Sequence, residues 1–366
     1  MPAPLSVPLF DTETPLAPLR ARLLEAIEEV VDSGRFILGP QVRAFEEEFA
    51  AYLGAGDAVG VANGTDALTI ALRAMGVGPG DDVVVPSFGF FASAEAIPAA
   101  GARPVFCDVD PDTFCATPET VRAALTPDTR AVIVVHLFGN VAPVGEIEAL
   151  GVPVLEDAAQ AAGAEGPYGR AGALGRAATF SFFPSKNLGC FGDGGAIVTS
   201  DPGIAERARV LRFHGSTDKL TFEQVGYNSR LDAIQAAVLR VLLPHLEDWA
   251  AARDAAGAGY GEAGLGELVA LPRPTPGARA AWHVYAVRHP RAGELVGPLG
   301  DGGVEARRYY PTPIHRQPAM RPWGAGVSLP ATEELARTHL ALPMGAALTP
   351  PAIEAVVAAV RAALQG

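Results

Sequence analysis

The chain has 366 residues, of which 49% are hydrophobic and 19% are charged, and this composition predicts a globular protein with room for two domains. Its net charge of −13 argues against nucleic acid as the main partner, although a local arginine or helix N-terminus could still hold a phosphorylated substrate. The 3 cysteines show no metal-binding spacing, which predicts reduced thiols and a cytoplasmic protein. We expect no signal peptide and no membrane span, because the first residues lack a charged and apolar leader and no apolar run is long enough.

Apolar residues at helical spacing predict a first helix over residues 15–33 and a second one that Gly54 ends. Apolar strands then alternate with short helices, a pattern typical of an α/β protein whose mostly parallel sheet is buried on both faces. The strands are expected near residues 59–62, 83–85, 104–107, 131–136, 152–156, 178–183 and 196–199. The helices between them are expected near residues 65–75, 92–99, 118–125, 144–150 and 204–213.

The C-terminal part of the chain lacks the regular alternation of strands and helices. A helical pattern covers residues 230–256, where Pro244 should kink or break the helix. Glycine and proline are frequent over residues 257–279, so a domain boundary is expected in or just before that stretch. We therefore predict a large domain over residues 1–250 and a smaller α+β domain over 251–366, with a strand near 282–287 and helices over 333–341 and 352–364.

A glycine-rich loop between two predicted buried strands carries Lys186. Pro184 ends the first strand, and the glycines that follow demand an irregular backbone. A lysine held in such a loop can lose its hydration, which lowers its pKa and makes it a nucleophilic amine. Taken alone, the pattern favours a surface lysine on a hairpin, and only the residues upstream change that interpretation.

Two upstream features supply the partners that such a lysine needs. Asp157 ends a short apolar strand, and Gln160 follows three residues later. Earlier still, a strand runs through Asn63 and Gly64 into a helix, which is the geometry that places backbone N–H groups on a phosphate. A phosphate cradle, a buried aspartate and a strand-end lysine, in this order, are typical of pyridoxal-phosphate enzymes, in which the lysine forms the Schiff base and the aspartate pairs with the pyridinium nitrogen.

Six motifs make the chain resemble the DegT/StrS-type nucleotide-sugar aminotransferases of the fold type I, aspartate-aminotransferase-like superfamily. They are Phe36-Ile-Leu-Gly-Pro, Asn63-Gly-Thr-Asp-Ala-Leu, Glu156-Asp-Ala-Ala-Gln, Phe180-Ser-Phe-Phe-Pro-Ser-Lys-Asn-Leu-Gly, Gly192-Asp-Gly-Gly-Ala and Gly226-Tyr-Asn-Ser-Arg-Leu-Asp. The resemblance implies a seven-stranded, mostly parallel sheet with one antiparallel strand. It also implies pyridoxal 5'-phosphate as cofactor and the transfer of an amino group from L-glutamate to a nucleotide-linked keto-sugar.

The resemblance also implies roles around the cofactor ring. Lys186 would bind the cofactor and move the proton between the donor carbon and the cofactor, and its presence favours transamination because the sugar dehydratases of the family have a histidine there. Asp157 would keep the ring nitrogen protonated. Gln160 matches the residue near the ring oxygen, and Phe90 matches the aromatic side chain that stacks on the ring.

The phosphate would be held by Gly64, Thr65 and Ser181, and by Asn228 of the other subunit. A phosphate contact from the other subunit implies a homodimer with shared active sites. From the residues alone, the preferred interpretation of Asn228 is a turn residue after Gly226. The resemblance places sugar contacts at Tyr309, Tyr310 and His315, although such side chains in a proline-rich loop more often have packing or surface roles.

Three alternatives stay open at this point. Amination at C3 of a 3-keto-hexose fits the motifs around the lysine best, with C4 amination of a 4-keto nucleotide sugar as the alternative. A pyridoxal-phosphate lyase or a sugar dehydratase would share the fold, but a cysteine desulfurase would need a late cysteine and the last one is Cys190. A regulator of the same fold would need a DNA-binding domain and a basic patch, and the sequence suggests neither.

Overall fold

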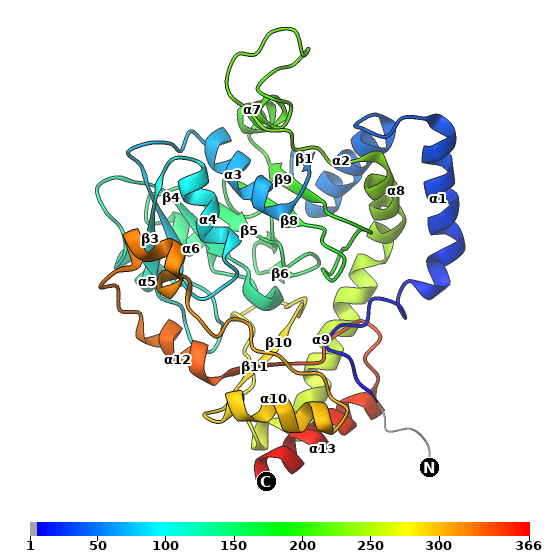
Figure 1. Cartoon of the computed structure of the whole chain (residues 1–366), viewed down its shortest axis with the longest axis vertical. Helices are drawn as coiled ribbons and strands as arrows, with labels where there is room; N and C mark the ends of the chain where they lie inside the picture. The colour runs from blue at the N-terminus through cyan, green and yellow to red at the C-terminus, as the bar shows by residue number, and fades with distance from the viewer. Residues whose placement is uncertain (1–5) are drawn as a thin grey trace.

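The computed structural model describes residues 6–366, and a seven-stranded sheet lies at its centre (Figure 1). The strand order is β1-β9-β8-β5-β4-β2-β3. The strands are β1 (Asp57–Val61), β2 (Asp82–Pro86), β3 (Arg103–Cys107), β4 (Thr129–Val135), β5 (Val154–Asp157), β8 (Ala177–Ser181) and β9 (Gly195–Thr199). Only β9 runs antiparallel to its neighbours, which confirms the predicted mixed sheet with one antiparallel strand.

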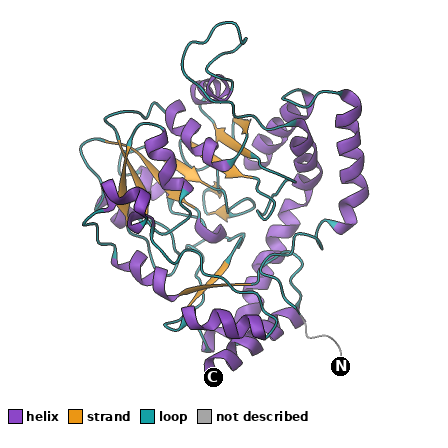
Figure 2. Ribbon diagram, viewed as in Figure 1, coloured by secondary structure: helices purple, strands orange, loops and turns teal. Residues whose placement is uncertain are grey.

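Helices cover both faces of this sheet, which explains why its strands are almost entirely apolar. Val83 and Val85 of β2 pack with one layer, α3 (Gly64–Ala74), α4 (Ala92–Ala99) and α7 (Pro202–Arg212). Val84 points the opposite way, as strand geometry requires, toward α5 (Pro118–Arg122) and α6 (Val144–Glu148). The helices α2 (Pro40–Leu53) and α8 (Ala233–Leu242) cover the β8–β9 end of that second face, and α1 (Arg20–Ser33) packs on α8 (Figure 2).

The helical pattern after residue 230 is broken where the sequence predicts it. A 3-10 turn over Leu243–His245, which contains Pro244, separates α8 from α9 (Leu246–Glu262). Beyond α9, a third core forms around the antiparallel pair β10 (Tyr285–Arg288) and β11 (His339–Leu342). The helices α10 (Ala292–Asp301) and α13 (Pro350–Gln365) cover this pair.

One prediction in this region is wrong, and one helix was not predicted. Residues 339–341 were expected at the end of a helix, but α12 (Pro330–Thr338) ends earlier and His339 begins β11. Leu340 and Leu342 face the third core while Ala341 faces the first, an alternation that four residues are too few to reveal in the sequence. Helix α10 was not expected, because three glycines and Pro298 mask its apolar face, which burial of Leu295 and Leu299 stabilises.

The beginning of the described chain lies against its C-terminal part. The Val7 amide donates to the Gly303 carbonyl at 2.9 Å, and the Leu9 amide donates to a Glu305 carboxylate oxygen at 3.1 Å. Helix α9 runs through the boundary predicted at residue 250, and residues 1–5 of the predicted large domain lie outside the described residues. The division into 1–250 and 251–366 stays a prediction. No helix within residues 6–366 combines the length and apolar character that a membrane crossing requires.

Candidate active site

Two of the predicted phosphate-binding residues, Gly64 and Ser181, meet at one end of the sheet. Val61 at the end of β1 and Ser181 at the end of β8 both pair with Gly195 at the start of β9. The helix α3 begins only three residues after Val61, and a Cβ placed on Gly195 would lie 2.9 Å from the Gly64 nitrogen. The carboxyl ends of parallel strands are where ligands bind in open α/β sheets.

The loop that carries Lys186 is tightly folded. The Lys186 amide donates to the Phe183 carbonyl at 2.8 Å. Gly189 is required because a Cβ there would lie 2.5 Å from the Pro184 oxygen. The neighbouring Asn187 side chain ties the loop to the second half of the chain, since its amide nitrogen donates to the Ala281 carbonyl at 2.9 Å. The lysine is therefore anchored on both sides.

Burial changes the chemistry of the Lys186 amine. Loss of hydration lowers the pKa of Lys186 to about 8, and the negative charge of Asp157 opposes part of that shift. A neutral, nucleophilic amine is therefore populated near physiological pH. This is the property that the sequence predicted for a lysine in this loop.

Asp157 lies buried at the end of β5, with 6% of its surface exposed. The Ser93 hydroxyl donates to one carboxylate oxygen at 2.6 Å, and the Ala159 amide donates to the other at 3.2 Å. Burial raises the pKa of Asp157, while these hydrogen bonds and the charge of Lys186 act in the opposite direction. A cation that entered beside this carboxylate would stabilise its ionised form.

The preceding residue, Glu156, has a structural role on the opposite face of β5. Its carboxylate accepts the amides of Gly172, Leu174 and Gly175 at 2.7–2.8 Å. It also lies 2.7 Å from Nε2 of His136, whose Nδ1 accepts the Ala142 amide, so Nε2 carries the proton and donates. The adjacent carboxylates of β5 thus serve different purposes, because successive side chains point to opposite faces.

The N-terminus of α3 fits a phosphate. The Asn63 side chain caps the helix by accepting the Asp66 amide at 2.8 Å, and the amides of Gly64 and Thr65 have no partner among residues 6–366. A Cβ on Gly64 would lie 2.8 Å from the Ser181 Cβ, so only glycine lets the serine approach this closely. Free amides, the helix dipole and the Ser181 hydroxyl at one point match a dianion.

Asn228 does not complete this cradle within its own chain. Its side chain is exposed and accepts a hydrogen bond from Arg230, and no hydrogen bond links it to Gly64, Thr65 or Ser181 within the described part of the chain. Several large apolar side chains are also exposed, in the stretch just before Asn228 and in the loop that carries Lys186. They are Leu220, Phe222 and Val225 in the first and Phe183 and Phe191 in the second, with 48–85% of each surface accessible.

Three predicted residues that lie far apart in the sequence, Phe90, Gln160 and Tyr310, lie close together in the fold. The Gln160 amide nitrogen donates to the Tyr310 hydroxyl at 3.1 Å, while the Gln160 oxygen accepts the Phe138 amide at 2.7 Å. The Tyr310 ring lies 6.1 Å from that of Phe90, which is 57% exposed and free to cover a flat ligand. Burial raises the pKa of Tyr310, so its hydroxyl stays protonated.

The other two predicted sugar contacts differ from each other. Tyr309 is partly buried, and its ring lies 6.5 Å from that of Phe10. His315 is only 2% exposed, and its Nδ1 lies 2.7 Å from the Ser87 hydroxyl oxygen. This histidine therefore lies beneath the loop that carries Phe90, where its contacts fix that loop.

Sequence reasoning missed four residues around the lysine: Phe10, Ser93, Arg253 and His283. Phe10 and Arg253 line a cavity of about 50 Å³ together with Lys186. His283 is buried, and its ring stacks on Phe10 with 5.3 Å between centroids. No short-range pattern connects these residues to the lysine loop, because tertiary packing alone brings them together.

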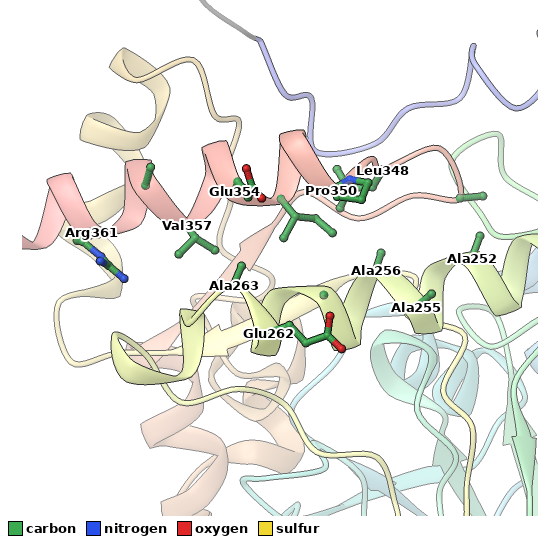
Figure 3. Close-up of a pocket in the computed structure, with 14 residues that line it drawn as sticks. Ala252, Ala255, Ala256, Glu262, Ala263, Leu348, Pro350, Glu354, Val357 and Arg361 are labelled. Atoms are coloured by element: carbon green, nitrogen blue, oxygen red, sulfur yellow. The ribbon is translucent and has the colours of Figure 1, made fainter.

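A larger cavity lies away from these residues. It measures about 790 Å³ and runs between α9 and α13, as Figure 3 shows. Alanines and aliphatic side chains form most of its lining, and Glu262, Glu354 and Arg361 are its charged residues. Nothing there resembles the lysine–aspartate pair, so the smaller space beside Lys186 is the better candidate.

Comparison with known proteins agrees with this geometry. The profile of the DegT/DnrJ/EryC1/StrS aminotransferase family matches residues 18–361. The chain is 46% identical to the dTDP-3-amino-3,4,6-trideoxy-alpha-D-glucose transaminase of Streptomyces venezuelae, covering 97% of this chain and 95% of that one. It is 41% identical to the UDP-N-acetyl-3-dehydro-alpha-D-glucosamine 3-aminotransferase of Acidithiobacillus ferrooxidans, covering 99% of each.

A solved structure also matches this chain over nearly its whole length. The crystal structure of DesV from S. venezuelae, in complex with a ketimine intermediate, superposes with a TM-score of 0.94 at 45% identity, covering 98% of both chains. The lysine–aspartate pair, the phosphate cradle and these matches lead to one conclusion. The chain belongs to the DegT/DnrJ/EryC1/StrS aminotransferase family and is a sugar transaminase.

Proposed function

We propose that this enzyme uses pyridoxal 5'-phosphate to move the amino group of L-glutamate onto C3 of a nucleotide-linked 3-keto-hexose. The observation that carries the proposal is the partly neutral Lys186 amine facing a buried Asp157 at the sheet edge. The names of two relatives, both of which specify a 3-amino product or a C3 reaction, support C3 over C4.

The residues present fit the proposed cofactor. Gly64, Thr65 and Ser181 would hold its phosphate, Asp157 would face the ring nitrogen, and Phe90 would cover one ring face. A Cβ at Gly64 would close the cradle, and a buried carboxylate such as Asp157 is costly unless a cation joins it. When bound, pyridoxal phosphate supplies the electron sink for the reaction.

Lys186 and its neighbours carry out the proton handling. The free amine of Lys186 can take a proton from the carbon of the amino donor in one half-reaction, and its protonated form can give a proton to the sugar carbon in the other, because its pKa of about 8 lies near working pH. The Ser93 hydroxyl holds the Asp157 carboxylate in one orientation. Gln160 fixes Tyr310, so the polar wall of the site is set before a substrate arrives.

A homodimer with shared active sites is part of this proposal. Two points support it: a phosphate dianion can accept more hydrogen bonds than Gly64, Thr65 and Ser181 donate, and Asn228 is exposed, as are the apolar side chains of Phe222 and Val225 a few residues before it. Exposed apolar surface of this kind marks interaction sites. We also place the enzyme in the cytoplasm, where its thiols Cys107, Cys115 and Cys190 would remain reduced, as they are in the structure.

The test is a product assay with nitrogen-15 glutamate. The purified enzyme is mixed with cofactor, labelled glutamate and matched 3-keto and 4-keto hexoses on dTDP, UDP and GDP. Mass spectrometry identifies aminated products, and NMR locates the label on the sugar ring. The proposal predicts label at C3, whereas label at C4 would replace the C3 assignment and no label on any sugar would reject the activity.

A further inference from the structure

The N-terminal segment, residues 7–12, occupies a place that the sequence did not suggest. We call it the N-terminal strap. Its backbone bridges two distant parts of the chain, because Val7 pairs with residues 303–305 and the Leu9 carbonyl accepts the Met344 amide at 3.2 Å. Figure 1 shows this dark blue segment passing beside α9 before the chain reaches α1. The strap is thus fixed at one end and leads toward the active site.

Phe10 of the strap joins the aromatic side chains of the predicted sugar site. Its ring stacks on His283 at 5.3 Å with an interplanar angle of 16°, and it lies 6.5 Å from the ring of Tyr309. Tyr309 lies 5.7 Å from Tyr310, which in turn contacts Phe90 and Gln160. These aromatic side chains form a series that runs from the strap to Phe90, the residue predicted to stack on the cofactor ring. Phe10 is partly exposed, so it is not sealed within the core.

The strap also borders Lys186. Phe10, Asp11 and Thr12 line a cavity of about 50 Å³ whose wall also includes Lys186 and its loop neighbours Pro184, Ser185 and Asn187. Pockets that bind small molecules combine apolar and aromatic walls with a few placed polar groups, and the strap supplies such a wall next to the loop that carries Lys186.

His283 is suited to hold Phe10 in place. It is 4% exposed, and its amide donates to the Phe138 carbonyl at 2.8 Å, so its backbone is tied to the turn that also binds Gln160. Burial, with Lys186 and Arg253 nearby, keeps the pKa of His283 well below its usual range. The ring is therefore neutral and offers a flat stacking surface.

We infer that the N-terminal strap forms one wall of the sugar site, with Phe10 contacting the keto-sugar and His283 positioning Phe10. This inference rests on the proposed function, since it names residues that select the sugar substrate. The amino donor reacts in a separate half-reaction that needs no sugar. The strap should therefore affect the sugar half-reaction and leave the donor half-reaction unchanged.

The test compares Phe10→Ala, Phe10→Leu, His283→Ala and His283→Phe in the full-length enzyme. Calorimetry measures the Kd of an unreactive nucleoside-diphosphate hexose that has a hydroxyl in place of the ketone, with and without cofactor. Single-turnover absorbance measures the donor half-reaction. Tyr168→Ala is the matched control, because Tyr168 is 77% exposed in the β6–β7 (Glu165–Gly166 and Gly169–Arg170) turn.

We expect Phe10→Ala and His283→Ala to raise the Kd about 10- to 100-fold, which is the range for a lost apolar contact at a specificity site. His283→Phe keeps a stacking ring and should remain within about threefold of the wild type, and Phe10→Leu should fall between. The donor half-reaction should stay within about twofold in the Phe10 variants. An unchanged Kd in Phe10→Ala, or an equal loss in both half-reactions, would overturn the inference. Failure of the proposed function would appear separately, as a wild type that aminates no keto-sugar.

Discussion

Adding one methyl group at Gly64 should weaken cofactor binding without unfolding the enzyme. The new Cβ of Gly64→Ala would lie 2.8 Å from the Ser181 Cβ and 3.4 Å from its hydroxyl oxygen, so the serine must move away. Alanine is otherwise acceptable at the first position of α3, because the φ angle of Gly64 is not positive. The effect should therefore be confined to the phosphate cradle.

The size of the effect follows from the contacts at risk. Displacing Ser181 removes at least one charge-assisted hydrogen bond to the phosphate, which costs about 1.5–3 kcal/mol. The Kd for pyridoxal phosphate should rise about 10- to 150-fold. Titration of the cofactor-free protein, followed by visible absorbance, measures this Kd directly.

Two further variants make the result specific. Gly145→Ala in α6 is the control, since no atom lies within 4 Å of a Cβ there. Combining Gly64→Ala with Ser181→Gly removes the Cβ that clashes, so the double variant should bind better than the sum of the two single losses predicts. If the Gly64→Ala protein bound the cofactor as tightly as Gly145→Ala does, the proposal that Gly64 and Ser181 hold the cofactor phosphate would be refuted.

The remaining predictions concern charge and assembly. Asp157→Asn should lose most of its activity while retaining the fold, because the ring nitrogen loses its anionic partner, and near-wild-type turnover would argue against that role. The rate of cofactor attachment to the cofactor-free protein should rise with pH and level off above about 8, where Lys186 is deprotonated, and the midpoint should fall in Asp157→Asn because the carboxylate raises the pKa of Lys186. Stopped-flow absorbance across pH would show both, and a rate independent of pH would contradict them. Mixed refolding of inactive Lys186→Ala with Asn228→Asp should restore activity, since one site of a shared dimer would carry neither lesion. No recovery from proven mixed dimers would show that each subunit builds its own site.

The sequence revealed most of the fold because its signals are local. Apolar strands that alternate with short helices predicted the central sheet, and Pro244 predicted the break between α8 and α9. The prediction failed at β11 and α10, where a strand of four residues and a glycine-rich helix depend on burial in the third core. Local patterns do not report such tertiary stabilisation.

The residues of the candidate site also fall into two groups: those that local sequence patterns reveal and those that only the folded chain brings together. Lys186, Asp157 and Gly64 belong to motifs whose chemistry is readable in a few consecutive residues. Ser93 and His283 became visible only in three dimensions, since α4 packs on the end of β5 and the 281–284 segment packs on the turn after β4. His315 belonged to the resembling segments, but the fold buries it beneath the loop that carries Phe90.

The central claim is that Lys186 binds pyridoxal phosphate covalently, and reductive fixation of the cofactor tests it most directly. The result is easy to assign because the chain has few lysines. The sequence contains only two lysines, Lys186 in the active-site loop and Lys219 in a loop where its ammonium lies 4.7 Å from the Phe213 ring. The purified enzyme with pyridoxal phosphate is treated with borohydride, digested and mapped by mass spectrometry, with Lys219→Arg and Lys186→Arg as matched controls. The account predicts the label on Lys186 in the wild type and in Lys219→Arg, and none in Lys186→Arg. A label on Lys219, or no label on either lysine, would contradict it.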